Sequence, residues 1–187
     1  MKQLTSLLLV TCLSAMATPS FANNDAPILL QPKQPSRAEL AQLQTQLNQA
    51  KLKWKKQQPI HYSYNLQRTC FCPAEYNHPI NIRVFKGKVQ QATVMTPPNA
   101  PTNGRRAAEQ PLSADRKAEA MPIEGLFKII QDAIKQKASS LKVTYDPRYG
   151  YPLTIAIDYN SMIADEESAW TISNFKVASG LKPSQPK

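Results

Sequence analysis

The sequence predicts an α+β fold, an antiparallel sheet of about five or six strands with two helices packed on one face. Two segments repeat apolar residues at three- and four-residue spacing, which is the pattern of helices with one buried side. Each segment is followed by three runs in which apolar and polar residues alternate, the pattern of strands with one buried face. The hydrophobic share of 42% supplies enough apolar surface for a core, which excludes a wholly disordered chain.

The first helix is predicted to begin after Ser36 and to end before Pro59. Ser36 and Glu39 have the spacing of a capping box, in which each side chain bonds the backbone amide of the other residue. Pro59 cannot continue a helix because it lacks an N–H and its ring clashes with the preceding turn. The apolar stripe between these limits consists of Leu40, Leu43, Leu47, Ala50 and Trp54.

Three strands are predicted after this helix. Alternation predicts strands at residues 60–67, 80–84 and 89–95, and Lys86-Gly87 supplies the tight turn of a hairpin between the second and the third.

A second helix and three further strands complete the pattern. Pro122 is placed in the first turn of this helix, where proline is tolerated. Strands are then predicted from Val143 onward, at 153–159 and at 169–177. The buried face of the second helix is formed by Ile123, Leu126, Phe127, Ile130 and Ile134.

The first 22 residues have the composition of a secretory signal peptide. Lys2 gives a positive start, residues 7–17 form an apolar run too short to span a bilayer, and Ser20 and Ala22 are small residues before the cleavage site. We therefore expect a periplasmic or secreted protein with no transmembrane segment after signal cleavage. Proline and polar residues divide the rest into a flexible arm at 23–35, a single α+β domain at 36–177 with a flexible loop at 96–121, and a loose tail at 178–187.

The chain is basic, with 23 Lys+Arg against 13 Asp+Glu. A cluster of cations surrounds Trp54 near the end of the first helix and favours an acidic protein or an anionic envelope surface as partner. Nucleic acid is not expected as a partner, because an exported protein rarely meets it. In the other interpretation these cations complement the helix dipole while Trp54 packs in the core. The cluster consists of Lys51, Lys53, Lys55 and Lys56.

Cys70 and Cys72 are the only cysteines outside the predicted signal peptide. Four interpretations stay open: a local structural bridge, a reducible disulfide, copper or zinc ligation together with His78 or His61, and pairing between chains. Residues two apart in an extended strand are ~6.6 Å apart, near the upper limit for a bridge, so Pro73 and the following loop would have to turn the chain. A bridge closing three residues stabilises a fold by only about 1.6 kcal/mol, so global stability is a weak reason for the pair.

Recognised catalytic motifs are missing, including His-Glu-x-x-His, Gly-x-Ser-x-Gly and a Gly-rich phosphate loop. We therefore expect a binding or interaction module that is not an enzyme and has no cofactor; a thiol-redox or copper/zinc-binding envelope protein is the alternative. Tyr149 and Tyr151 are candidates for an exposed binding edge, unless the Asp, Pro and Gly residues around them only build a turn. The acidic cluster at 165–167 lacks the spaced oxygen ligands of a calcium loop and is interpreted as a solvated turn.

A set of short motifs is more specific in combination than any motif alone. The set comprises Trp54, Tyr62-Ser63-Tyr64, Cys70-Phe71-Cys72-Pro73, the turn from Tyr145 to Pro152, and Asp165-Glu166-Glu167. Between Trp54 and Phe175 this combination resembles secreted bacterial proteins that are grouped as domain-of-unknown-function family 6174. The resemblance implies an exported bacterial protein of one domain; it carries no established activity and no site residues.

Overall fold

The computed structural model describes residues 34–95 and 110–178, all within the unit Gln31–Lys187. The predicted signal peptide, most of the predicted arm, the first part of the predicted loop and nearly all of the predicted tail lie outside these residues. Across the two described segments, no helix combines the length and the apolar character that crossing a membrane requires.

Helix α1 (Arg37–Gln57) begins with the predicted capping box. The hydroxyl of Ser36 accepts a hydrogen bond from the Glu39 amide at 3.1 Å, and the Glu39 carboxylate accepts one from the Ser36 amide at 2.7 Å. Helix α2 (Ile123–Lys135) starts directly after Pro122. Pro122 has an extended backbone and occupies the N-cap position, whereas the sequence predicted it inside the first turn. Both helices bury one side, as their apolar spacing predicts.

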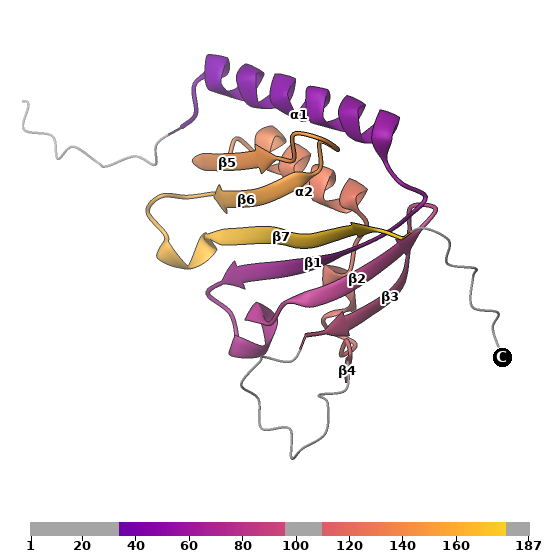
Figure 1. The fold of residues 1–187 in the computed structure, drawn as a ribbon. Helices are drawn as coiled ribbons and strands as arrows, with labels where there is room; N and C mark the ends of the chain where they lie inside the picture. The colour runs from indigo at the N-terminus through magenta and orange to yellow at the C-terminus, as the bar shows by residue number, and fades with distance from the viewer. Residues whose placement is uncertain (1–33, 96–109, 179–187) are drawn as a thin grey trace, which may run out of the picture. The chain divides into compact units, whose positions relative to one another are not determined.

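Seven antiparallel strands form one sheet in the order β4-β3-β2-β1-β7-β6-β5, and the α+β fold class is confirmed. The sheet has one strand more than the upper predicted number, because β4 pairs only two residues with β3 and is too short for any periodicity. Its strands are β1 (His61–Cys70), β2 (Ile80–Phe85), β3 (Lys88–Val94), β4 (Gln110–Pro111), β5 (Ser140–Tyr145), β6 (Pro152–Asp158) and β7 (Ser168–Val177). The predicted hairpin turn at Lys86-Gly87 is present, with φ values of 48° and 72° (Figure 1).

The flexible loop predicted at 96–121 is corrected for residues 110–121, while 96–109 lie outside the described residues. This segment contains β4 and the short helix η2 (Lys117–Glu119), and it buries Leu112 and Arg116. Arg116 is only 4% exposed, and its guanidinium donates hydrogen bonds to backbone carbonyls of the β1–β2 connection. An arginine that is satisfied in this way leaves no trace in an apolar pattern, so the sequence suggested a loop.

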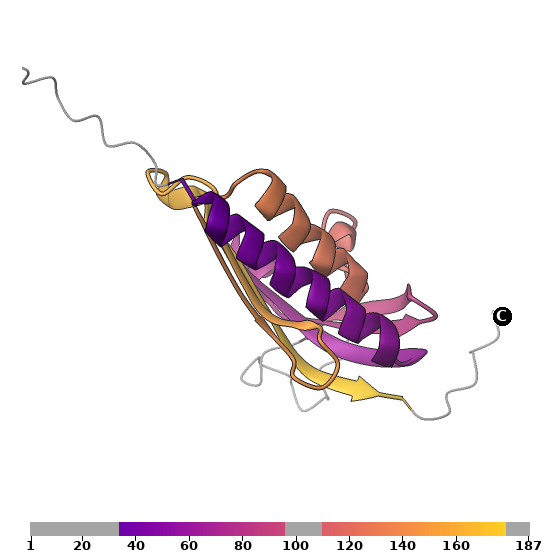
Figure 2. The same cartoon turned by 90° about the horizontal axis from the view of Figure 1, so that it is seen from above.

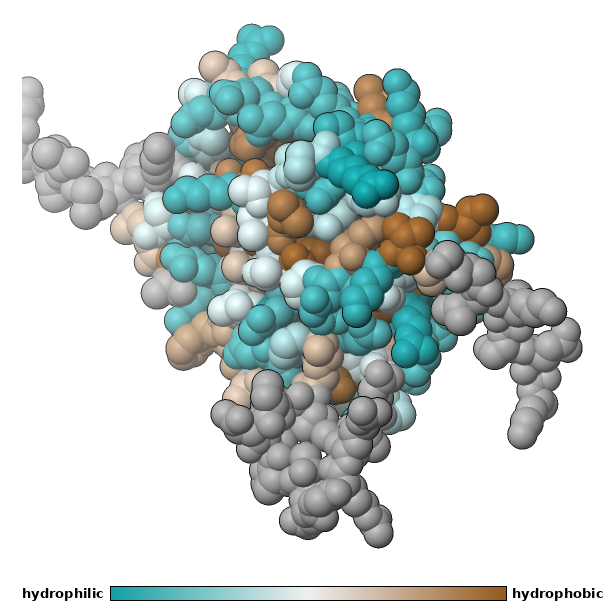
Figure 3. Space-filling model, in the orientation of Figure 1, coloured by the Kyte–Doolittle hydropathy of each residue, from teal (hydrophilic) through white to brown (hydrophobic). Residues whose placement is uncertain are grey.

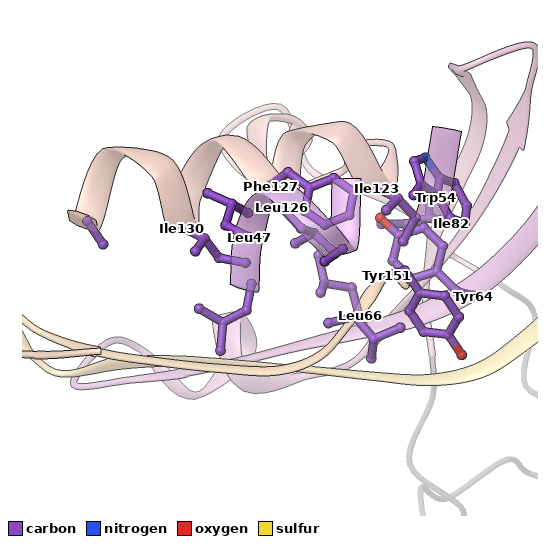
Figure 4. Close-up of a cluster of buried hydrophobic side chains, with 14 of the residues drawn as sticks. Leu47, Trp54, Tyr64, Leu66, Ile82, Ile123, Leu126, Phe127, Ile130 and Tyr151 are labelled. Carbon is purple, nitrogen blue, oxygen red and sulfur yellow. The ribbon is translucent and has the colours of Figure 1, made fainter. Parts of the chain in front are cut away.

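Both helices pack on one side of the sheet (Figure 2). The core fills the space between them and the sheet, where Leu47 and Trp54 of α1 and Leu126 of α2 meet inward-facing strand residues such as Tyr64 and Ile82 (Figure 4). Burying these side chains stabilises the fold by roughly 1.5–3 kcal/mol for each large apolar residue.

The opposite side, here called the helix-free face, carries polar side chains. One row crosses four strands in register, from Gln67 through Thr171 and Thr154 to Thr144, and all four residues are exposed. Hydrophilic residues also cover much of the surface in view in Figure 3. The sheet therefore has one buried face and one solvated face, as the alternation predicts.

Candidate functional site

The four lysines predicted as binding candidates separate into two pairs. Lys51 donates to the Gln131 side chain at 3.3 Å, and Lys53 donates to the carbonyl of Pro147 at 2.9 Å. In the described parts of the chain, Lys55 and Lys56 are exposed and form neither a hydrogen bond nor an ion pair. Trp54 is 2% exposed and packs in the core, and Lys55 and Lys56 lie in the last turn of α1, where cations complement the helix dipole, as the second interpretation holds. The same two lysines are exposed, so the binding interpretation stays open for them.

Two adjoining hollows of about 360 and 620 Å³ lie where α1, α2 and the β2–β3 turn meet. They share Lys55, Gln58 and Glu124 in their walls. We call this region the basic groove; its further walls are Lys51, Trp54, Phe127, Pro59, Ile60, Lys86 and Gly87.

The basic groove combines cations with exposed apolar surface. Ile60 is 64% exposed, and the Lys86 ammonium lies 5.2 Å from the centroid of the Phe85 ring. Glu124 is the one acidic residue in its walls, and it accepts a hydrogen bond from the Trp54 indole at 2.8 Å. Three lysines against one engaged carboxylate leave the groove with excess positive charge.

The structure corrects the predicted binding edge at Tyr149 and Tyr151. Tyr151 is 6% exposed and stacks on Phe175 at 4.5 Å between ring centroids, so it belongs to the core. Tyr149 is half-buried against the same ring. The backbone amides of Arg148 and Tyr149 donate to the Asp146 carboxylate, so this segment is a structural turn.

Cys70 and Cys72 lie at the end of the central strand β1, where the chain bends. Their Sγ atoms are 2.03 Å apart and their Cα atoms 5.3 Å apart, closer than an extended strand allows. Asn77 accepts a hydrogen bond from the Cys70 amide at 3.3 Å, which ties this bend to the following loop. Between the two cysteines, Phe71 is 80% exposed.

The predicted copper or zinc ligands do not come together. Within residues 34–95 and 110–178 no three His, Cys, Asp or Glu residues are grouped so that they could hold a metal ion. The sulfur atoms of Cys70 and Cys72 face each other rather than a third ligand. A metal centre at these residues is therefore not supported.

Sequence reasoning missed a third hollow, of about 420 Å³, beside Phe71. Asp158, Glu167 and Lys142 line it together with small residues of four strands. The available signal was an apolar residue, Phe71, placed between the two cysteines just beyond β1. The hollow also requires β5, β6 and β7 to lie beside the end of β1, and local sequence patterns do not predict the order of strands in a sheet.

A comparison with protein families finds one match: the model described as Family of unknown function (DUF6174) matches residues 46–177. This range includes all seven strands, all of α2 and the second half of α1. No curated protein and no solved structure matches the chain. Any function must therefore be argued from the residues themselves.

Proposed function

Since the chain belongs to this family of unknown function, we propose its role from its own residues: an exported, non-enzymatic binding module whose basic groove holds an acidic segment of a partner protein. Support for export is the signal-peptide pattern of residues 1–22, and the basic groove is the observation that carries the binding role.

The basic groove suits a carboxylate with an apolar neighbour. Lys55 and Lys86 both line the 620 Å³ hollow, beside the exposed side chain of Ile60. A carboxylate between two ammonium groups gains charge-assisted hydrogen bonds, and an adjacent apolar side chain removes surface of Ile60 from water. Charge complementarity of this kind sets the choice of partner and the rate of association.

The recessed form of the groove favours a protein segment over an anionic membrane surface. A flat surface reaches protruding cations, whereas Lys51, Trp54 and Phe127 line the walls of a hollow. An extended chain can enter such a hollow with single side chains. The absence of catalytic motifs in the sequence supports the non-enzymatic part of the proposal.

Fluorescence anisotropy with a labelled hexapeptide, Glu-Leu-Glu-Glu-Leu-Glu, tests the binding role. The double variant Lys55→Glu/Lys86→Glu is expected to weaken binding about tenfold or more, because it reverses both charges at the groove. The matched control Lys117→Glu/Lys135→Glu has the same net charge with changes remote from the groove, and it should bind nearly as the parent protein does. Equal losses of affinity in both variants would show that the peptide responds only to the net charge of the protein. Binding to anionic lipid vesicles but not to the peptide would mean that the partner is an anionic membrane surface and not a protein.

The Cys70–Cys72 pair enters the proposal as a local bridge that fixes the end of β1. Its support is the bend that brings the Cα atoms of Cys70 and Cys72 within 5.3 Å and the oxidising compartment that export implies. Intact-mass measurement of protein taken from periplasm is expected to show cleavage after Ala22 and two alkylated cysteines only after reduction. Two thiols that react without reductant would favour the thiol-redox alternative instead. An uncleaved chain would remove the argument for export.

A further inference from the structure

The 420 Å³ hollow beside Phe71 lies on the helix-free face, at the other end of β1 from the basic groove. Ile60 precedes the first residue of β1 and Phe71 follows the last, so the two regions are about 30 Å apart along a ten-residue strand. The hollow exists because small side chains occupy one row of the sheet: Ala156 is paired with Ala169, and Ala169 with Thr69. An extended peptide can therefore approach the sheet closely here.

The charge of this hollow is opposite to that of the chain as a whole. Asp158 and Glu167 line it, and Lys142 is the one cation among its walls. Between residues 149 and 175 the sequence has four acidic residues and no Lys or Arg, on a chain with a formal net charge of +10. Because screening limits the reach of charges to about 8–10 Å, these nearby carboxylates determine the potential inside the hollow.

Asp158 has an unmet hydrogen-bonding capacity. Its Oδ1 atom is shielded from solvent and has no hydrogen-bond partner in the described part of the chain. Lys142 lines the same hollow and forms no ion pair with Asp158 among residues 34–95 and 110–178. The carboxylate has no ion-pair partner among these residues, so a cation that enters the hollow meets a charge that is not neutralised.

Phe71 supplies the apolar contact. Its side chain is 80% exposed, and the backbone of the preceding Cys70 is tied to the following loop through the Asn77 side chain. An aromatic ring whose backbone is already fixed loses little conformational entropy on binding. Aromatic faces also attract cations.

From these observations we propose a second binding site, the acidic hollow, defined by Thr69, Phe71, Ala156, Asp158, Glu167 and Ala169. Its ligand is an arginine or lysine side chain of an extended peptide, with an apolar residue next to it. The cation binds the carboxylates of Asp158 and Glu167, and the apolar neighbour covers Phe71. Arginine fits better than lysine, because a guanidinium can engage two carboxylates at once. This site goes beyond the proposed function, since it lies at the opposite end of the sheet and selects the opposite charge.

An NMR titration of the folded, ¹⁵N-labelled protein with acetyl-Leu-Arg-Leu amide tests the site. Amide shifts are expected to concentrate at Thr69, Phe71, Ala156 and Ala169. The counterpart with citrulline in place of arginine has the same shape without the charge, and it should bind about tenfold more weakly or not at all. Equal binding of the two peptides, or shifts centred elsewhere, would overturn the proposal.

Isosteric variants separate the site from general charge effects. Asp158→Asn/Glu167→Gln is expected to weaken the arginine peptide about tenfold, and Phe71→Ser several-fold. Asp132→Asn controls for the loss of a carboxylate outside the hollow, because Asp132 lies on α2 and pairs with Lys128. Unchanged affinity in the Asp158/Glu167 variant would refute the site, provided that its spectrum shows the same fold.

Discussion

Gly150 shows how one residue fixes the position of the β5–β6 turn against α1. Its φ is +82°, and a Cβ added there would lie 2.8 Å from the Ala50 carbonyl oxygen and 2.9 Å from the Lys53 Cβ. Gly150→Ala therefore combines a left-handed backbone cost of about 1–2 kcal/mol with overpacking of about 1–3 kcal/mol. We expect a loss of 2 kcal/mol or more in the free energy of unfolding, measured by urea titration.

Gly87 is the natural control for this prediction. It also has a positive φ, +72°, but a Cβ there would meet nothing within 4 Å. Gly87→Ala should lose only the backbone cost of about 1–2 kcal/mol. Equal losses at the two glycines would show that the contact with α1 contributes nothing.

The turn around Gly150 also shows which features of single residues can be predicted from a sequence. Its Asp, Pro and Gly residues predict a turn correctly, because turn chemistry is local. The burial of Tyr151 was not predictable, since its neighbours Trp54 and Phe175 come from α1 and β7. The same holds for Asp158, whose hollow is formed by residues of four strands.

Among the elements, the segment that carries β4 and η2 depends on one side chain. The Arg116 guanidinium pairs with Glu119 at 2.8 Å and donates to carbonyls of Glu75, Tyr76 and His78. Replacing it by methionine keeps the length but leaves a buried carboxylate and several carbonyls without their donor. Arg116→Met is expected to cost about 3–5 kcal/mol of unfolding free energy.

Lys117→Met serves as the control for this change, because Lys117 is exposed one residue further along. It should change stability by less than about 0.5 kcal/mol. Hydrogen exchange adds a second readout: the amides of Tyr76 and His78, which donate to the carbonyls of Pro73 and Glu75, should lose protection in Arg116→Met. If urea midpoints and exchange both stayed unchanged, the segment would be held by other contacts.

The predictability of the elements follows their length. Both helices and six strands were predicted, because each repeats its apolar period several times. β4 was not, since two residues show no period. The capping box of α1 was predicted to the residue, because Ser36 and Glu39 interact across a single turn.

At the scale of the whole molecule, the fold class was predictable and the strand order was not. Two helices with two sets of hairpin strands imply an α+β sheet from local patterns alone. The pairing of β1 with β7, which joins the two halves, links residues about a hundred positions apart. Both the basic groove and the acidic hollow arise from such long-range neighbours, which is why the sequence indicated the lysines of the basic groove but not its shape, and did not indicate the acidic hollow.

Tyrosines from both halves enter the core, and this makes stability sensitive to alkaline pH. Burial raises the pKa of Tyr145 to about 12; burial, aided by Asp146, raises the pKa of Tyr151 to about 12. Burial also raises the pKa of Tyr62 and Tyr64 well above the usual 10. Between pH 10 and 12 the unfolded chain therefore loses protons that the folded protein keeps, so the free energy of unfolding falls as the pH rises.

Urea titrations between pH 9 and 12 should show this decline, although many lysines lose their charge near pH 10.4 and thereby relieve repulsion, which acts in the opposite direction. Tyr145→Phe separates the two effects, because it removes one titrating hydroxyl and leaves every lysine in place. Its stability should fall less steeply with pH than that of the parent protein. Parallel curves for the two proteins would mean that Tyr145 ionises equally easily in the folded and the unfolded chain, which would contradict its burial in the core.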